Sequence, residues 1–93
     1  MGLPIGTVTV VSAGTRVAVA TSGHAVSAVS FKARAANAGN VFIGDDTVSS
    51  ASGYELAPGD EITISFRESV DLRRFYVDAA GNGDKVDYAG VAA

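Results

Sequence analysis

The chain has 93 residues, enough for one domain with one hydrophobic core, and 47% of them are hydrophobic, although many of these are alanines. The formal net charge of -3 argues against a basic surface for nucleic acid, and the absence of cysteine excludes disulfides, thiolate catalysis and zinc–thiolate sites. No apolar run approaches the roughly 20 residues that cross a bilayer, and the start MGLPIG carries no export pattern. We therefore expect no nucleic-acid and no membrane partner.

Alternation of apolar and polar residues predicts short, half-buried strands along the chain. The first two strands are expected at residues 7–10 and 16–19. A two-residue hairpin loop at Ala13-Gly14 would join them and place Val10 opposite Val17.

The segment SAVSFKARAANAG has two interpretations. Its alanines and the closing Gly39 would suit the end of a helix. However, Val26, Val29 and Phe31 do not form a continuous helical stripe, so we predict a strand.

The Gly44-Asp45-Asp46 segment offers two neighbouring carboxylates, and Asp60, Asp84 and Asp87 lie in or near other loops. A calcium site needs about six to eight convergent oxygens, and the spacing matches no known calcium loop. We expect a tight turn in which the Asp side chains accept hydrogen bonds from nearby backbone, and no metal site.

Two further turn signals frame the last strands. Pro58-Gly59 predicts a type II turn that leads into the clearest strand, residues 61–67. Asn82-Gly83 predicts a type I′ hairpin turn. In that hairpin Val77 would face Tyr88, and Asp78 would lie opposite Asp87.

Together these signals predict an all-β fold, a small β-sandwich or jelly-roll-like barrel of about seven or eight short antiparallel strands. We expect residues 1–93 to form a single β domain, with residues 1–6 as a candidate extended N-terminal arm. Because large apolar side chains are few and neither a disulfide nor a metal supports the core, we expect burial against a second copy of the chain.

No catalytic or cofactor-binding constellation is found. His24, the single histidine, has no framed nucleophile or orienting carboxylate, and the glycine-rich segments NAGNVFIG and GNG match no phosphate loop. We expect no catalytic residue and no cofactor. Among the aromatic residues, Phe75 and Tyr88 are predicted in the core, and Tyr54 and Tyr76 are free to contact a partner.

Two stretches in the C-terminal two thirds of the chain form a recognisable pattern of strands and turns, NVFIGDDTVSSASGYELAPGDEITI and DLRRFYVDAAGNGDKVDY. In this pattern the chain resembles a group of small virion proteins of tailed bacteriophages. The matching positions are Asn37, Gly39, Val41, Phe42, Ile43, Gly44, Val48, Ser49, Gly53, Tyr54, Leu56, Pro58, Gly59, Leu72, Tyr76 and Val77.

The resemblance implies a β-sandwich protein of the head-decoration or cement type, which is made in the host bacterial cytoplasm, binds the outer capsid surface of the virion and stabilises the shell. Its partners would be the major capsid protein and further copies of itself in a homotrimer, with no enzymatic activity. A fibre or tail-associated module, with glycan contacts through Tyr54 or Tyr76, is the alternative. The candidate interface residues are Leu3, Pro4, Ile5, Asp45, Asp46, Tyr54 and Tyr76.

Overall fold

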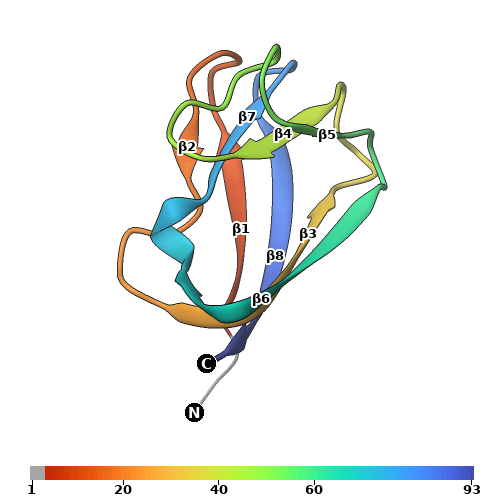
Figure 1. Cartoon of the computed structure of the whole chain (residues 1–93). Helices are drawn as coiled ribbons and strands as arrows, with labels where there is room; N and C mark the ends of the chain where they lie inside the picture. Colours follow the sequence, from red (N-terminus) through yellow and green to blue (C-terminus); the bar gives the residue numbers. More distant parts are fainter. Residues whose placement is uncertain (1–3) are drawn as a thin grey trace.

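The computed structural model describes residues 4–93 as a small β-sandwich of two four-stranded antiparallel sheets (Figure 1). This confirms the predicted all-β class. The first sheet has the order β1 (Ile5–Val10), β8 (Asp84–Ala92), β3 (Ala25–Ala33) and β6 (Glu61–Asp71). The second has the order β2 (Val17–Ala18), β7 (Tyr76–Ala79), β4 (Val41–Gly44) and β5 (Tyr54–Leu56). The one helical segment among the described residues is a short 3-10 helix, η1 (Leu72–Arg74).

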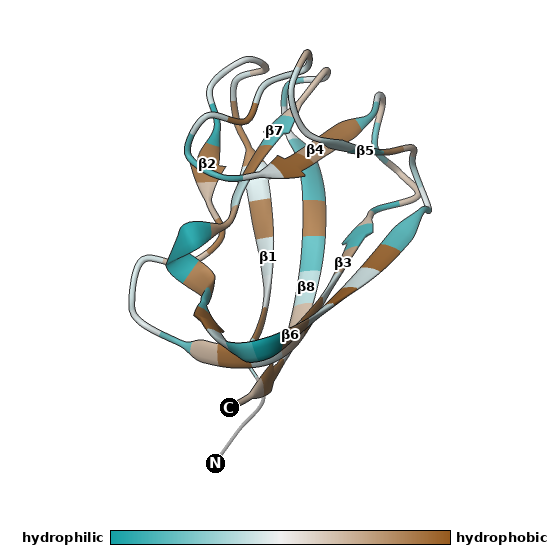
Figure 2. Cartoon of the chain, in the orientation of Figure 1, coloured by the Kyte–Doolittle hydropathy of each residue, from teal (hydrophilic) through white to brown (hydrophobic). Residues whose placement is uncertain are grey.

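The core lies between the sheets and is filled by alternate side chains of the strands, as the bands of hydropathy in Figure 2 indicate. Phe31 on β3 and Val86 on β8 are both fully buried. The ring centroid of Phe75 lies 5.5 Å from that of Phe31 and 5.9 Å from that of Phe66. Burial of a ring such as Phe31 stabilises the fold by about 2–3 kcal/mol. The strand predicted in the segment that contains Phe31 is confirmed as β3.

The predicted hairpin at Ala13-Gly14 is wrong, although the turn itself is present. Thr15 donates a backbone hydrogen bond to the Ser12 carbonyl at 3.0 Å, and Gly14 has a φ of 87°. The strands on either side of this turn enter different sheets, because Val10 pairs with Asp84 and Val17 with Val77.

The hairpin predicted around Asn82-Gly83 is also wrong, because β7 and β8 belong to different sheets. Asp78 pairs with Phe42, and Asp87 pairs with Thr7 and Lys32. A type I′ turn needs positive φ at both central residues. Among residues 4–93 only glycines have positive φ, so Gly83 meets this condition and Asn82 does not.

The type II turn at Pro58-Gly59 is confirmed. Asp60 donates its backbone N–H to the Ala57 carbonyl at 2.9 Å, and Gly59 has a φ of 89°. This turn starts β6, the longest strand of the described chain. From Glu61 to Ser65 the strand pairs regularly with β3, and then the register shifts. Residues 66–69 therefore form an irregular stretch, where β6 bends sharply (Figure 1).

Candidate interaction surfaces

Two carboxylates among residues 4–93 are buried, and both accept backbone hydrogen bonds from loops. Asp84, only 4% exposed, accepts from the N–H of Ala38 at 2.9 Å and from that of Gly39 at 3.0 Å. Asp78, 2% exposed, accepts from the N–H groups of Gly14 and Ala79. These acids hold the fold together, because they satisfy loop donors that would otherwise be buried without partners.

The burial of Asp84 could have been predicted from the sequence, although this residue was expected only in or near a loop. Asp84 lies two residues before Val86 and four before Tyr88, so the strand alternation directs all three toward the same face. That face packs on the core. A polar residue at the start of an inward-facing series indicates a buried hydrogen-bond acceptor.

The Asp45-Asp46 segment is confirmed as a turn in which an Asp side chain accepts hydrogen bonds from its own neighbourhood. Asp45 accepts from the Thr47 hydroxyl at 2.6 Å and from the Thr47 backbone N–H at 2.9 Å. These hydrogen bonds lower the pKa of Asp45. The loop beyond them covers the outer face of its sheet, since Val48 and Phe42 are both buried and both lie against Gly53.

Asp45, Asp46 and Tyr76 line one depression of about 380 Å³ together with Arg73 and Arg74. The pairing of Gly44 with Tyr76 brings the β4 end beside the start of β7. Three of the predicted interface residues are therefore neighbours. Arg73 and Arg74 were not among the predicted interface residues, although their closeness to Tyr76 in the sequence was an available signal.

Arg73 is held in this depression by Asp71. The two side chains form an ion pair at 2.9 Å, and the Asp71 side chain also accepts the Arg73 backbone N–H at 2.9 Å. These hydrogen bonds lower the pKa of Asp71 from 3.8 to about 2. Arg74 has no such ion pair among the described residues, so its charge is available to a partner.

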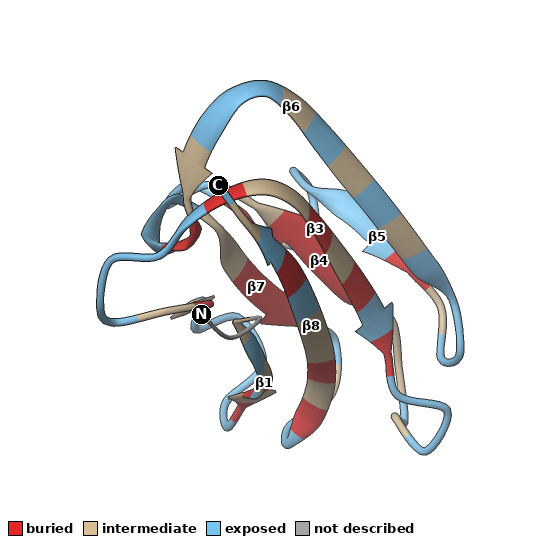
Figure 3. Ribbon diagram, turned by 90° about the horizontal axis from the view of Figure 1, so that it is seen from below, coloured by how far each residue is buried: buried red, intermediate tan, exposed pale blue. Residues whose placement is uncertain are grey.

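Tyr54 lies apart from that depression. It is 57% exposed on the edge strand β5, where it pairs with Ile43 and so shares the inner face of its sheet. β5 and β6 are the outermost strands at the same edge of the sandwich, as Figure 3 shows.

The predicted interface residues Pro4 and Ile5 lie against strand β8 of the same chain. Ile5 is 67% exposed but belongs to β1, where it pairs with Ala89. The Pro4 carbonyl accepts the Gly90 N–H at 2.8 Å. Residues 4–6 of the predicted arm thus lie against β8, and Leu3 lies outside the described residues.

The free edge of β6 forms a second surface. Ile62, Ile64 and Phe66 face the core but are only half-buried, and the residues between them are exposed, which gives β6 its tan and blue bands in Figure 3. A hollow of about 830 Å³ follows residues 66–71 along the bend. Apolar side chains and unpaired backbone groups are therefore accessible together.

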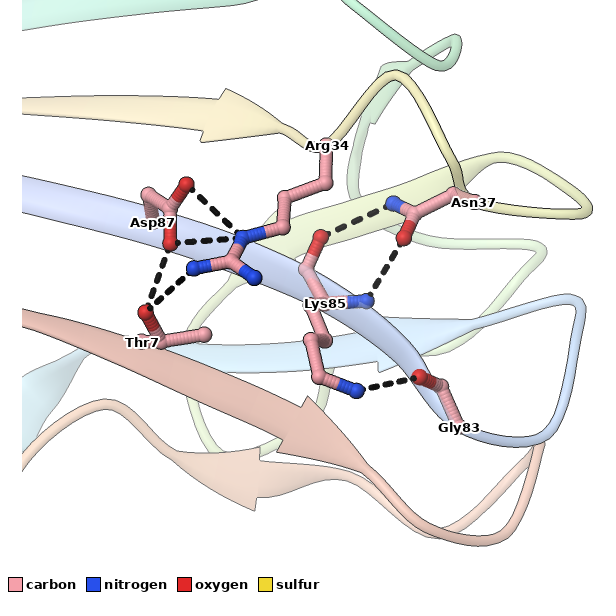
Figure 4. A network of polar contacts seen from close by, with 6 residues as sticks. All are labelled: Thr7, Arg34, Asn37, Gly83, Lys85 and Asp87. Carbon is pink, nitrogen blue, oxygen red and sulfur yellow. Dashed lines mark hydrogen bonds and ion pairs between the residues drawn. The ribbon is translucent and has the colours of Figure 1, made fainter.

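The outer face of the β1-β8-β3-β6 sheet is polar. The Arg34 guanidinium bonds Asp87 at 3.0 Å and the Thr7 hydroxyl at 3.2 Å (Figure 4). The pKa of Asp87 is lowered by hydrogen bonds from Arg34 and Thr7. Asn37 bonds both the N–H and the carbonyl of Lys85 through its side-chain amide. Because this network joins β1, β8 and the loop after β3, we assign it to the stability of the sheet.

Residues 4–93 contain no group of three or more His, Asp or Glu side chains that could hold a metal ion. In the same range no helix has the length and hydropathy to span a bilayer. No protein-family model, curated protein or solved structure matches the chain.

Proposed function

We propose that the protein is a structural component of a tailed-bacteriophage particle, a cement protein that binds the outer surface of the assembled capsid. The observation that carries this proposal is the exposed edge of β6, where half-buried apolar side chains and free backbone groups offer a surface for assembly. Most carboxylates that could serve acid–base chemistry are instead bonded within the fold, as for Asp45, Asp71, Asp84 and Asp87.

The residues of the resemblance support the proposal because many belong to one structural unit. Residues 41–44, 54, 56, 76 and 77 lie in the adjacent strands β4, β5 and β7. Pro58-Gly59 forms the turn that follows β5. The resemblance therefore concerns three neighbouring strands and the turn that leads from β5 into β6.

The mechanism is mass action. A protein that binds the assembled shell and not the free capsid subunit stabilises the shell by the free energy of that binding. Its partners would be the major capsid protein and, as the resemblance implies, two further copies of this chain in a homotrimer.

The depression between Asp45, Asp46 and Tyr76 is the proposed capsid contact. An aromatic ring and the Arg74 guanidinium are residue types enriched at protein interfaces. The neighbouring carboxylates and guanidinium groups would select a capsid surface of alternating charge.

The test uses particles of the phage that encodes this chain. We expect the protein in purified particles at a fixed ratio to the major capsid protein, measured by quantitative mass spectrometry. Particles made without it should assemble but release their DNA at a lower temperature, and added purified protein should restore the original temperature. Absence of the protein from purified particles would refute the proposal.

A charge change in the depression tests the proposed contact. Asp46→Lys should lower occupancy on particles, because it reverses a charge in the contact. Val11→Lys is the control, since Val11 is 73% exposed and lies outside the depression. Equal occupancy of the two variants would exclude this surface as the capsid contact.

A fibre or tail-associated module that binds glycans is the second candidate. It is favoured by one observation: Tyr76 lies beside carboxylates and arginines in a depression whose volume suits a small ligand. Aromatic rings stack on sugar faces, and charged groups bond hydroxyls. A glycan array that gives no signal with the intact protein at millimolar sugar would exclude it.

A further inference from the structure

The two sheets have four edge strands, and β6 is by far the least protected of them. β2 has two residues and β5 has three, and such short edges offer little backbone to a new partner. β1 lies beside β2 and β7 of the other sheet. β6 has 11 residues and pairs only with β3.

The backbone groups that β6 leaves free can be identified from its pairing with β3. Ala33 donates its N–H to the Asp60 carbonyl at 2.9 Å. In an antiparallel ladder the bonded residues alternate, so Ile62 and Ile64 bond to β3. Thr63 and Ser65 therefore direct their N–H and C=O groups away from the sheet.

The side chains of this edge lack the features that prevent pairing with another strand. Edge strands are commonly protected by Lys or Pro, and residues 61–66 contain neither. Their sequence EITISF combines β-branched and aromatic residues, which favour strand pairing. Ile62, Ile64 and Phe66 also remain half-buried, so a further strand would complete their burial.

We infer that a second copy of this chain pairs with β6 through its own β6, antiparallel and about a two-fold axis at Ile64. Glu61 then lies opposite the partner's Arg67, and Arg67 lies opposite the partner's Glu61. Both side chains are exposed in the single chain. Ile62 meets the partner's Phe66 on the inner face, and Thr63 and Ser65 exchange backbone hydrogen bonds with the partner's Ser65 and Thr63.

Charge complementarity selects this register. A shift of two residues in either direction would place Glu61 opposite a serine, Ser65 or Ser69, and would lose both ion pairs. A shift of one residue would place apolar side chains opposite polar ones across the sheet. Because residues 66–69 do not pair with β3, their backbone groups can pair with the partner's β6.

This contact rests on the same β6 edge as the proposed function, but it does not use the depression proposed as the capsid contact, so self-association and particle occupancy test the two proposals separately. A two-fold contact closes at two chains, so a homotrimer would require a different surface. If the chain forms a homotrimer through that other surface, the β6 edge would join two trimers. If it does not, the β6 edge would join two single chains into a dimer.

The first experiment tests the register by charge exchange in the full chain. In a homodimer of the Glu61→Arg variant, both charge pairs would become pairs of two arginines. In a homodimer of the Arg67→Glu variant, both would become pairs of two glutamates. Each variant should self-associate about tenfold more weakly than the unmodified chain, because two opposite-charge pairs become two like-charge pairs. When the two variants are mixed, both pairs again have opposite charges, and native mass spectrometry should detect the mixed dimer in preference to either homodimer.

The second experiment tests the backbone pairing. Thr63→Pro removes an N–H that points away from β3, so the strand should keep its own ladder while losing the contact. Thr63→Ala is the matched control, because both variants lose the hydroxyl contact with Ser30 at 2.7 Å but the Ala variant keeps the N–H. Circular dichroism and urea unfolding report whether both variants fold.

Sedimentation equilibrium should give a reversible dimer, or an even multiple of the trimer, for the unmodified chain and for Thr63→Ala but not for Thr63→Pro. Any of three results would overturn the inference. These are a chain that stays monomeric or trimeric at millimolar concentration, association that Thr63→Pro leaves unchanged, and charge variants that fail to pair when mixed.

Discussion

Replacement of Asp84 tests whether a buried carboxylate fastens the loop after β3 to strand β8. The carboxylate accepts two backbone N–H groups, one on each oxygen, at 2.9 and 3.0 Å. Loss of a partner leaves a buried donor unsatisfied, at a cost of about 1–3 kcal/mol for each group. Asp84→Ala should therefore lower the free energy of unfolding by about 3 kcal/mol.

That loss is large for a chain of this size. Domains have roughly 0.05–0.15 kcal/mol of stability per residue, or about 5–14 kcal/mol for 93 residues. Asp84→Asn keeps one acceptor oxygen and should lose about half as much, about 1.5 kcal/mol. Should the Ala variant fail to fold, the Asn variant still gives the measurement.

Urea unfolding followed by circular dichroism measures these differences. The control is Asp46→Ala, because Asp46 is exposed and a surface change of this kind alters stability by less than about 0.5 kcal/mol. If Asp84→Ala unfolds at the same urea concentration as Asp46→Ala, the carboxylate does not fasten the loop and the reasoning fails.

Three further changes have defined outcomes. Because the pKa of Asp71 is lowered to about 2 by its hydrogen bonds with Arg73, its contribution to stability is complete above about pH 4 and is lost as the pH falls toward 2. Asp71→Asn should therefore flatten the acid side of the stability curve, and an unchanged curve would contradict the assignment. Gly59→Ala should cost about 1 kcal/mol, because a positive φ strains any L side chain although no atom lies near the new Cβ. Gly81→Ala would place a Cβ 2.7 Å from Asp84 Oδ2 and should cost about 1–3 kcal/mol. The Gly81 effect should disappear in an Asp84→Ala background, and simple additivity would show that the clash is elsewhere.

Alternation of side chains was sufficient to predict β1, β3 and the first part of β6, and with the turn signals it predicted the fold class. Phe31 and Val29 on β3, and Ile62 and Ile64 on β6, face the core as their period of two requires. The turn at Pro58-Gly59 was predictable because proline and glycine each fix one of its φ angles. These features depend on local backbone geometry.

Strand pairing was not predictable from the turns. A turn such as Ala13-Gly14 reverses the chain but does not decide whether the next strand joins the same sheet or the opposite one. That choice depends on which apolar faces must meet across the core, and thus on residues far away in the sequence. Val10 finds its partner at Asp84, on the strand that also carries Val86.

The candidate surfaces were predicted in part. The sequence identified Tyr76 and Asp45 as accessible, and the structure brings both into one depression. The sequence did not distinguish Tyr54 from these two residues. Tyr54 lies on the edge strand β5, and β4 separates β5 from β7, which carries Tyr76. The importance of the β6 edge could not be recognised, since which strand lacks a neighbour is known only from the complete sheet order.

The pairing of β1 with β8 has a consequence for folding on the ribosome. Ile5 pairs with Ala89, so the first strand finds its neighbour only after the last strand has left the ribosome. Until then β1 is an unpaired strand with one apolar face, although β3 and β6 can already join. Such distant contacts slow folding, and the incomplete chain exposes strand edges on which other chains can aggregate. The buried side chains of β1 therefore gain their cross-strand neighbours only when β8 is present, which makes the first sheet the later of the two sheets to be completed, at its β1 edge.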